Sequence, residues 1–199
     1  MLAGVPAGAE RVVLAVGDSL SVDPEGIPTF VERLEIPGTR LVNLGCPGAS
    51  SADWVREPRP GAGPCYEAGA AGRLEPWLGK VDLVLVLIGS NDSYGFGEPE
   101  VTPPAVYRRN LERLVSRFEV PVILSVPPPN LIEVRMIAAY RTEIRRVVAA
   151  HAHVFFGVDF LGELPIKHLR DGAHPDAAGH AFMADLLRPV AIERLGGGD

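Results

Sequence analysis

Five short segments of the chain are almost continuously hydrophobic and rich in Val, Ile, Leu or Phe. Strands that are covered on both faces form such unbroken apolar runs, because neither face meets water. The pattern therefore predicts five buried parallel strands. They are expected at Arg11–Val16, Arg40–Leu44, Val81–Ile88, Val120–Val126 and His153–Val158.

Between these segments, apolar residues recur at three- and four-residue steps, which is typical of helices that bury one face. One helix is predicted from Pro103 to Phe118, with Thr102 as its N-cap and Pro103 at its first position. A second helix follows the fourth predicted strand. The core-facing positions of the two are Tyr107, Leu111, Leu114 and Phe118, then Ile137, Tyr140, Ile144 and Val147.

A last helix is expected to begin near Pro175. Pro189 is expected to end or kink it, because proline lacks an N–H and its ring clashes with the preceding turn. Segments Phe30–Leu34 and Glu67–Leu78 are weaker helix candidates. The buried face of the last helix is predicted to carry Ala178, Phe182 and Leu186.

Alternation of strands and helices along the whole chain predicts an α/β fold, a three-layer sandwich with helices on both faces of a parallel sheet. Five strands favour a flavodoxin-like sheet of order 2-1-3-4-5. We expect one domain over residues 1–199, structured from about 10 to 195. The Pro/Gly-rich stretch Arg56–Pro64 is expected to be a long loop, either at the rim of a site or on the surface.

The composition narrows the class of protein. Apolar residues make up 47% and charged residues 22%, so the chain can bury a core. A net charge of −6 argues against nucleic-acid binding, which needs a basic face. The longest apolar run, Leu83–Gly89, is too short for a transmembrane segment, and the first residues lack the pattern of a signal peptide. A cytoplasmic location is the default expectation, and secretion stays open because a removed leader would leave no trace.

The two cysteines, Cys46 and Cys65, are too few for a four-cysteine zinc site or a disulfide scaffold. The sequence leaves open whether they are free or paired. Neither a metal ion nor an organic cofactor is expected, and the sequence does not indicate an oligomeric state.

Polar residues follow the predicted strands at the points where ligands bind in open α/β sheets. These sheets bind ligands beyond the carboxyl ends of the strands, where the strand order reverses. Ser19 follows the first strand, Gly48 the second and Asn91 the third, while Asp171 and His174 precede the last helix. Their order predicts that the five residues converge.

Together these residue types are what acyl transfer to water requires. A serine hydroxyl needs a neighbouring base, and imidazole is the common one. A carboxylate on the other ring nitrogen fixes the tautomer. We therefore expect Ser19 as nucleophile, His174 as base and Asp171 as its orienting group. Donors for the oxyanion would be the backbone N–H of Ser19, the backbone N–H of Gly48 and the side-chain amide of Asn91.

Four blocks carry a family resemblance: GDSL at Gly17–Leu20, NLGCPGAS at Asn43–Ser50, GSND at Gly89–Asp92 and DGAHP at Asp171–Pro175. In this order and spacing, the chain resembles the SGNH hydrolases, also called the GDSL esterase/lipase family. The second block is looser than the others, with Gly45 as an alternative to Gly48. The resemblance implies a carboxylic ester hydrolase of esterase, lipase or thioesterase type. Its partner would be a small-molecule ester or acyl substrate.

Each block taken alone is compatible with an ordinary turn, since Gly, Asp, Asn and Ser all favour turns. Asp18 and Asp92 are expected to brace loops by accepting hydrogen bonds from backbone N–H groups. Two other functions stay open beside the general esterase. One is a carbohydrate O-acetyl deacetylase, and the other is a catalytically inactive ligand-binding module of the same fold. The acyl and alcohol portions of the substrate do not follow from the sequence.

Overall fold

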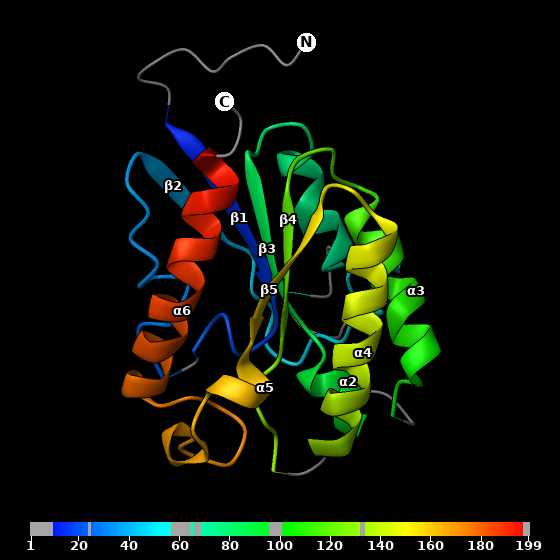
Figure 1. Cartoon of the computed structure of the whole chain (residues 1–199), viewed down its shortest axis with the longest axis vertical. Coiled ribbons are helices and arrows are strands. Elements are labelled where there is room, and N and C mark those ends of the chain that lie inside the picture. Colours follow the sequence, from blue (N-terminus) through cyan, green and yellow to red (C-terminus); the bar gives the residue numbers. More distant parts are fainter. Residues whose placement is uncertain are drawn as a thin grey trace.

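A single five-stranded parallel sheet forms the centre of the computed structural model, in the order β2-β1-β3-β4-β5 (Figure 1). This is the order predicted from the sequence. The structure describes residues 10–23, 25–56, 65, 69–95, 101–131 and 134–196. All five predicted strands are present, as β1 (Arg11–Gly17), β2 (Thr39–Asn43), β3 (Leu83–Leu87), β4 (Val122–Val126) and β5 (Val154–Asp159).

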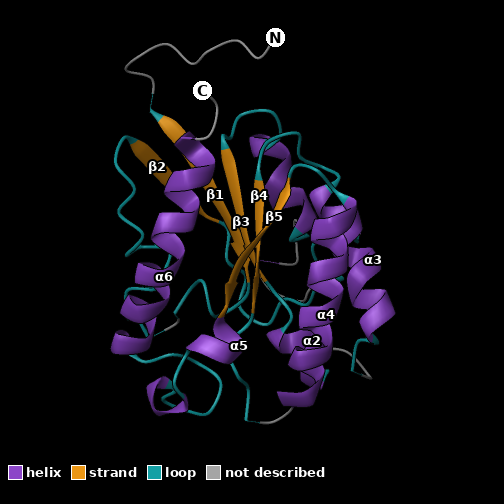
Figure 2. Ribbon diagram, in the orientation of Figure 1, coloured by secondary structure: helices purple, strands orange, loops and turns teal. Residues whose placement is uncertain are grey.

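Helices cover both faces of the sheet, with α6 on one side and α3 and α4 on the other (Figures 1 and 2). Short helices α2 and α5 lie near the carboxyl ends of the strands. The α-helices are α2 (Ser90–Tyr94), α3 (Pro104–Val115), α4 (Val134–Ala150), α5 (Phe160–Glu163) and α6 (Ala177–Gly196). Two 3₁₀ helices are η1 (Ala71–Trp77) and η2 (Ile166–His168).

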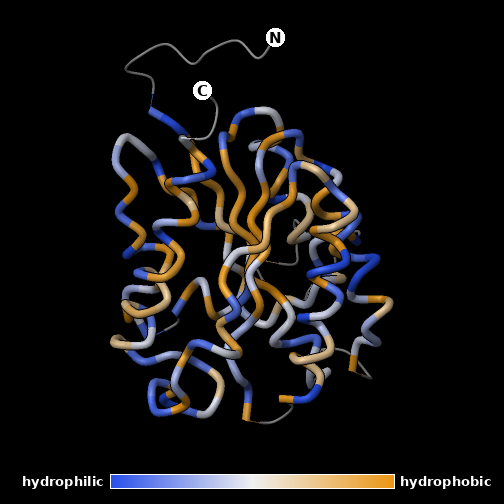
Figure 3. The backbone as a smooth tube through the Cα atoms, in the orientation of Figure 1, coloured by the Kyte–Doolittle hydropathy of each residue, from blue (hydrophilic) through white to orange (hydrophobic). Residues whose placement is uncertain are grey.

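The strands are buried on both faces, as their unbroken apolar runs predict. Along β1, Leu14 and Val16 pack in one hydrophobic cluster with α3 and α4, whereas Val13 and Ala15 pack in a second cluster with α6. The hydrophobic colour of the central strands in Figure 3 follows from this double burial. The sheet is therefore a rigid platform for the loops at its carboxyl edge.

The predicted stripes of α3 and α4 are confirmed, and their helices pack through stacked rings of Tyr107 and Tyr140, with centroids 4.1 Å apart. The predicted start of α3 is wrong by one residue. Pro103 is the N-cap and Pro104 the first helical residue, and no side chain caps the helix. Instead, the carbonyl of Thr102 accepts a hydrogen bond from the hydroxyl of Tyr140 at 2.6 Å.

The predicted buried face of α6 is out of register by one residue. Ala178 is exposed and Phe182 and Leu186 are only partly buried. The buried positions are Gly179, His180, Met183, Ala184, Leu187 and Ala191. The helix also continues through Pro189, contrary to the prediction that this residue ends it. Pro189 is exposed, and the core packing of Leu187 and Ala191 on either side of it keeps the chain helical.

The two weaker helix candidates differ from expectation. Residues 30–33 form turns rather than a helix, although the N–H of Arg33 donates to the carbonyl of Thr29 at 3.1 Å. A tertiary contact adds to these local bonds, since the backbone N–H of Phe30 donates to Nδ1 of His180 at 3.2 Å. Within Glu67–Leu78, residues Ala71–Trp77 form the 3₁₀ helix η1, which contains Pro76. The predicted loop Arg56–Pro64 lies outside the described residues after Arg56.

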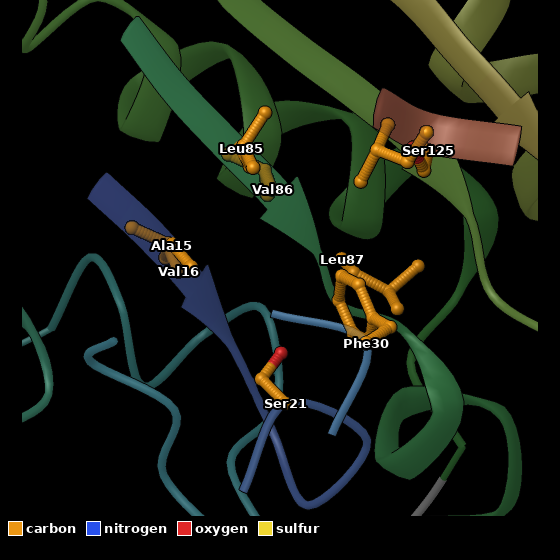
Figure 4. A pocket seen from close by; sticks show the side chains of 9 residues that line it. Ala15, Val16, Ser21, Phe30, Leu85, Val86, Leu87 and Ser125 are labelled. Carbon is orange, nitrogen blue, oxygen red and sulfur yellow. The ribbon is translucent and has the colours of Figure 1, made fainter. Parts of the chain in front are cut away.

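A small cavity lies inside the fold, bounded by β1, β3 and their neighbours (Figure 4). Its volume is about 10 Å³, which is about the least that one water molecule needs. Ser21 and Ser125 contribute hydroxyls to its wall, and the hydroxyl of Ser21 has no hydrogen-bond partner among the described residues. At this volume the cavity can hold nothing larger than a single water molecule.

Two buried carboxyl groups brace the loops at this edge, as expected. Oδ1 of Asp18 accepts the N–H of Leu20 at 2.9 Å. The Asp92 carboxylate accepts both the N–H and the hydroxyl of Ser51, at 2.7 and 2.6 Å. The amide of Asn110 on α3 donates to the Ser51 hydroxyl at 2.9 Å, which extends the network to the helical layer.

Burial raises the pKa of the Asp18 carboxyl to about 7. The hydrogen bond from Leu20 lowers this pKa, and the negative charge of Asp92 raises it further. Oδ2 of Asp18 has no partner within the described structure. Because the folded state binds a proton here more tightly than the unfolded chain, this group makes stability fall as the pH rises from about 4 to about 7.

The Asp18→Asn variant tests whether the ionisation of Asp18 makes stability depend on pH, since the amide has nearly the same shape and cannot ionise. We expect the variant to gain stability relative to the original protein as the pH rises. The gain is on the order of 4 kcal/mol at pH 8, since the pKa rises from 3.8 to about 7 and each pKa unit corresponds to about 1.4 kcal/mol. Thermal unfolding at pH 4, 6 and 8 measures it. Glu35→Gln, which removes an exposed carboxyl, is the control. Parallel pH profiles for Asp18→Asn and the original protein would contradict the raised pKa.

Candidate active site

Ser19 lies in the tight turn directly beyond the end of β1. The turn is closed by the N–H of Ser21, which donates to the carbonyl of Asp18 at 3.1 Å. Leu20 is buried and anchors the turn in the core, while Ser19 is only partly buried. The hydroxyl of Ser19 is thus held at a fixed place on the carboxyl edge of the sheet and remains open to a ligand.

Asp171 and His174 lie on a hairpin-like loop between η2 and α6. An antiparallel bridge between Leu169 and Pro175 closes the loop, and the N–H of Arg170 donates to the carbonyl of His174 at 2.9 Å. Gly172 adopts a positive φ of 86° at the turn, a conformation that favours glycine. This geometry brings the carboxyl and the imidazole of one short segment together.

The predicted serine, histidine and aspartate form one chain of hydrogen bonds, although Ser19 and His174 are 155 positions apart. Oγ of Ser19 lies 2.9 Å from Nε2 of His174, and Nδ1 of His174 lies 2.7 Å from Oδ2 of Asp171. An ionised carboxylate can only accept, so Nδ1 carries the ring hydrogen. In the neutral imidazole Nε2 is then the acceptor, and it faces the hydroxyl of Ser19.

The Asp171 carboxyl is kept ionised by its hydrogen bonds. Burial raises its pKa, but the backbone N–H groups of His174 and Ala173 and the ring of His174 outweigh this effect and lower the pKa to about 2. Oδ1 accepts the two N–H groups at 2.8 and 3.0 Å, which leaves Oδ2 for the ring. The charged form that orients the imidazole therefore persists throughout the physiological pH range.

Arg170 fixes the histidine loop to the segment that follows Ser19. Its guanidinium lies 2.8 Å from Asp23 and 2.9 Å from Glu25. The loop is also held from another side, where the N–H of Leu131 donates to the carbonyl of Gly172 at 2.9 Å. The sequence pattern does not indicate these positioning residues, apart from the place of Arg170 directly before Asp171.

Asn91 lies in the first turn of α2, beyond the end of β3. Its Nδ2 donates to the carbonyl of Ala49 at 2.8 Å, so the structure places it beside the loop that carries Gly48. A side-chain amide has two N–H hydrogens, and this bond uses one of them. Asn91 and the loop of Gly48 thus converge as the sequence predicts.

The Gly48 loop follows β2, contacts the end of β1 and turns at a glycine with a positive φ. The N–H of Cys46 donates to the carbonyl of Gly17 at 3.1 Å, and Gly48 has a φ of 80°. The alternative glycine, Gly45, already donates its N–H to Oδ1 of Asn43 at 3.0 Å. The hydrogen-bond pattern therefore favours Gly48 over Gly45 as the donor to a ligand.

Tyr94, three residues after Asn91 on α2, is a further residue of the site. Its hydroxyl donates to Oδ1 of Asn91 at 3.0 Å, which assigns the amide oxygen and nitrogen of that side chain. Burial raises the pKa of the phenol, and the negative charges of Asp18 and Asp171 raise it further, so it stays protonated as a donor. The three-residue spacing of Asn91 and Tyr94 on a helix is the signal that links them.

Other kinds of site find no support in the described part of the chain. Its residues contain no cluster of three or more His, Cys, Asp or Glu that could hold a metal ion. None of the helices within the described ranges is both long and apolar enough to cross a membrane.

Solved structures of esterases share this fold. A carbohydrate acetylesterase family member from Sinorhizobium meliloti has a TM-score of 0.70 at 19% identity, over 94% of this chain and 99% of its own. A mutant acetyl esterase with an acetate ion has a TM-score of 0.74 at 18% identity, over 95% and 100%. The lipase/acylhydrolase from Enterococcus faecalis has a TM-score of 0.71 at 22% identity, over 92% and 96%.

The search of curated proteins gives no significant match. The model of the GDSL-like Lipase/Acylhydrolase family matches residues 15–182, a range that begins in β1 and ends in α6. This range contains every block that carries the resemblance, from the turn of Ser19 to the loop of His174. The chain therefore belongs to the GDSL-like lipase/acylhydrolase family, also known as the SGNH hydrolases.

Proposed function

We propose that the protein hydrolyses carboxylic esters through an acyl-enzyme on Ser19. The observation that carries this proposal is the hydrogen-bonded chain from Ser19 Oγ through His174 to Asp171, with distances of 2.9 and 2.7 Å. Membership of a family of esterases and acylhydrolases supports it. A serine hydroxyl that faces the acceptor nitrogen of an oriented imidazole is an activated nucleophile.

The first half of the reaction forms the acyl-enzyme. Oγ of Ser19 attacks the carbonyl carbon of the ester, and its proton passes to Nε2 of His174. The carbonyl oxygen becomes an oxyanion, held by the N–H groups of Ser19 and Gly48 and by the amide of Asn91. The carbonyl then re-forms as the bond to the alcohol breaks, and His174 gives the proton to the leaving alkoxide.

The second half releases the acid. A water molecule attacks the acyl carbon while His174 takes one of its protons. The second tetrahedral intermediate uses the same oxyanion donors, and Oγ of Ser19 leaves with the proton from His174. Throughout, the ionised Asp171 stabilises the imidazolium that forms in each half.

Removal of small acyl groups from carbohydrates is the narrower alternative. Acetyl esterases are among the solved structures that share the fold, at identities below 20%. A general esterase and an acetyl-specific enzyme differ in how the rate depends on acyl length. An inactive binding module of the same fold would turn over no ester at all.

Hydrolysis of 4-nitrophenyl acetate, butyrate and octanoate tests the proposed function, together with labelling by a fluorophosphonate. We expect turnover and covalent labelling of Ser19. Ser19→Ala is expected to lower kcat on the order of 10⁶-fold, because the nucleophile and base act as a unit. Ser116→Ala, at the exposed end of α3, is the matched control and keeps full activity.

The same assays separate the alternatives. A steep fall in rate from acetate to octanoate supports the acetyl-specific enzyme. Absence of both turnover and labelling in the folded protein would overturn the hydrolase proposal in favour of a binding module. Labelling of a residue other than Ser19 would overturn the assignment of the nucleophile.

Tyr94 is proposed to position the Asn91 amide, because its hydroxyl holds Oδ1 and so directs Nδ2. Loss of one oxyanion donor costs about 10²–10³-fold in kcat. We expect Asn91→Ala to lose that much, and Tyr94→Phe to lose about tenfold in kcat with little change in KM, because the donor acts mainly in the transition state.

The double variant distinguishes positioning from a general structural role. If Tyr94 acts through Asn91, then Tyr94→Phe lowers kcat in the original protein but not in the Asn91→Ala background. Equal losses in both backgrounds, or a loss that tracks a lower melting temperature, would contradict the positioning role.

A further inference from the structure

Both cysteines of the chain lie at the loop that carries Gly48. Cys46 is fully buried within that loop, two residues before Gly48. Cys65 is partly buried and packs against the hydrophobic cluster that contains Cys46. Both are free thiols in the structure. The proposed ester hydrolysis uses neither sulfur, so their juxtaposition calls for a separate explanation.

Arg73, at the start of η1, connects the two segments. Its Nη1 donates to Sγ of Cys65 at 3.4 Å and to the carbonyl of Gly45 at 3.2 Å. One nitrogen therefore contacts both the sulfur of Cys65 and the residue before Cys46. Arg73 thus holds the segments of the two cysteines next to each other.

The two thiols differ in accessibility. Burial raises the pKa of the Cys46 thiol to about 12, Cys65 adds to the increase, and the positive charge of Arg73 opposes it. Because burial is the main cause, Cys46 is a poor thiol for attack on an external reagent whether or not Cys65 is present. Cys65 is the sulfur that a reagent reaches first, because it alone is partly exposed.

We propose that Cys46 and Cys65 form a redox-active dithiol, which a small-molecule disulfide converts into an intramolecular disulfide bond. The contact of Arg73 with Cys65 and with the residue before Cys46, and the packing of both cysteines at one hydrophobic cluster, carry this proposal. It is independent of the ester-hydrolysis proposal, because no step needs Ser19 or His174.

The exchange takes two steps. The thiolate of Cys65 attacks one sulfur of the small disulfide and forms a mixed disulfide, while the other half leaves as a thiolate. The leaving thiolate takes the proton of Cys46, whose sulfur then attacks Sγ of Cys65 and expels the second thiol. Overall, the two cysteines lose two electrons and two protons, and the small disulfide becomes two thiols.

The bond would join Cys65 to the loop that carries Gly48 and the backbone neighbours of Asn91. Closing the chain between positions 46 and 65 restricts the unfolded state, which stabilises the folded protein. We expect oxidation to raise the melting temperature by roughly 5–10 °C in a chain of this length.

Oxidised glutathione is the probe for the test, applied to the full chain after complete reduction. We expect the intact mass to fall by two hydrogen atoms, and peptide mapping to show Cys46 linked to Cys65. Dithiothreitol is expected to reverse both changes and the rise in melting temperature. Ester hydrolysis before and after oxidation reports whether the bond alters the Gly48 loop.

Two variants serve as matched controls. Cys65→Ser is expected to keep Cys46 unmodified and to show no rise in melting temperature with oxidised glutathione. Cys46→Ala is expected to stop at the mixed disulfide and to carry one glutathionyl group on Cys65. If Cys46→Ala fails to fold, the mapping of the original protein still decides.

Three results would overturn the proposal. They are two free thiols after oxidation, a stable glutathionyl group on Cys65 of the original protein, and a disulfide between two chains. Because activity is not the readout, an inactive esterase would leave these outcomes unchanged.

Discussion

The parallel register of three neighbouring strands is the constraint on which the candidate site depends. β1 lies between β2 and β3, with Ala15 paired to Asn43 and Gly17 paired to Leu87. Because all three strands run the same way, the segments after Gly17, Asn43 and Leu87 must leave the sheet side by side. The nucleophile candidate and the loops of the oxyanion candidates are therefore neighbours before any side-chain contact is made.

The aspartates of this region differ in their surroundings. These surroundings, rather than the residue type, decide whether an aspartate serves the fold or the proposed chemistry. Asp18 is fully buried, one of its oxygens has no partner among the described residues, and its pKa is raised to about 7. Asp171 is partly exposed and accepts three hydrogen bonds, and its pKa is lowered to about 2. An acid that orients an imidazole has to remain charged, whereas an acid that fills a loop does not. The same side chain can serve either purpose because solvent and donors set its charge.

The sequence predicted what depends on local pattern. The strands follow from unbroken apolar runs. Ser19 and Asn91 follow from turn residues at strand ends, and Asp171 and His174 from turn residues before the last helix. The features it failed to predict depend on packing between distant segments. The register of α6 is set by the fit of Gly179, where an added Cβ would lie only 2.8 Å from the carbonyl of His168. The contacts of Arg170 with Asp23 and Glu25 likewise exist only once the loops have met, so no periodicity in the chain could indicate them.

The histidine loop and the serine turn are held by different forces. The turn of Ser19 continues a central strand and is anchored by the core, whereas the loop of His174 is joined to the segment after Ser19 by the ion pairs of Arg170 with Asp23 and Glu25. Glu25 is exposed, so dissolved salt screens its pair with Arg170, whereas Asp23 is buried and its pair is screened much less. High ionic strength therefore weakens the outer contact of the histidine loop and leaves its inner contact and the packed sheet in place.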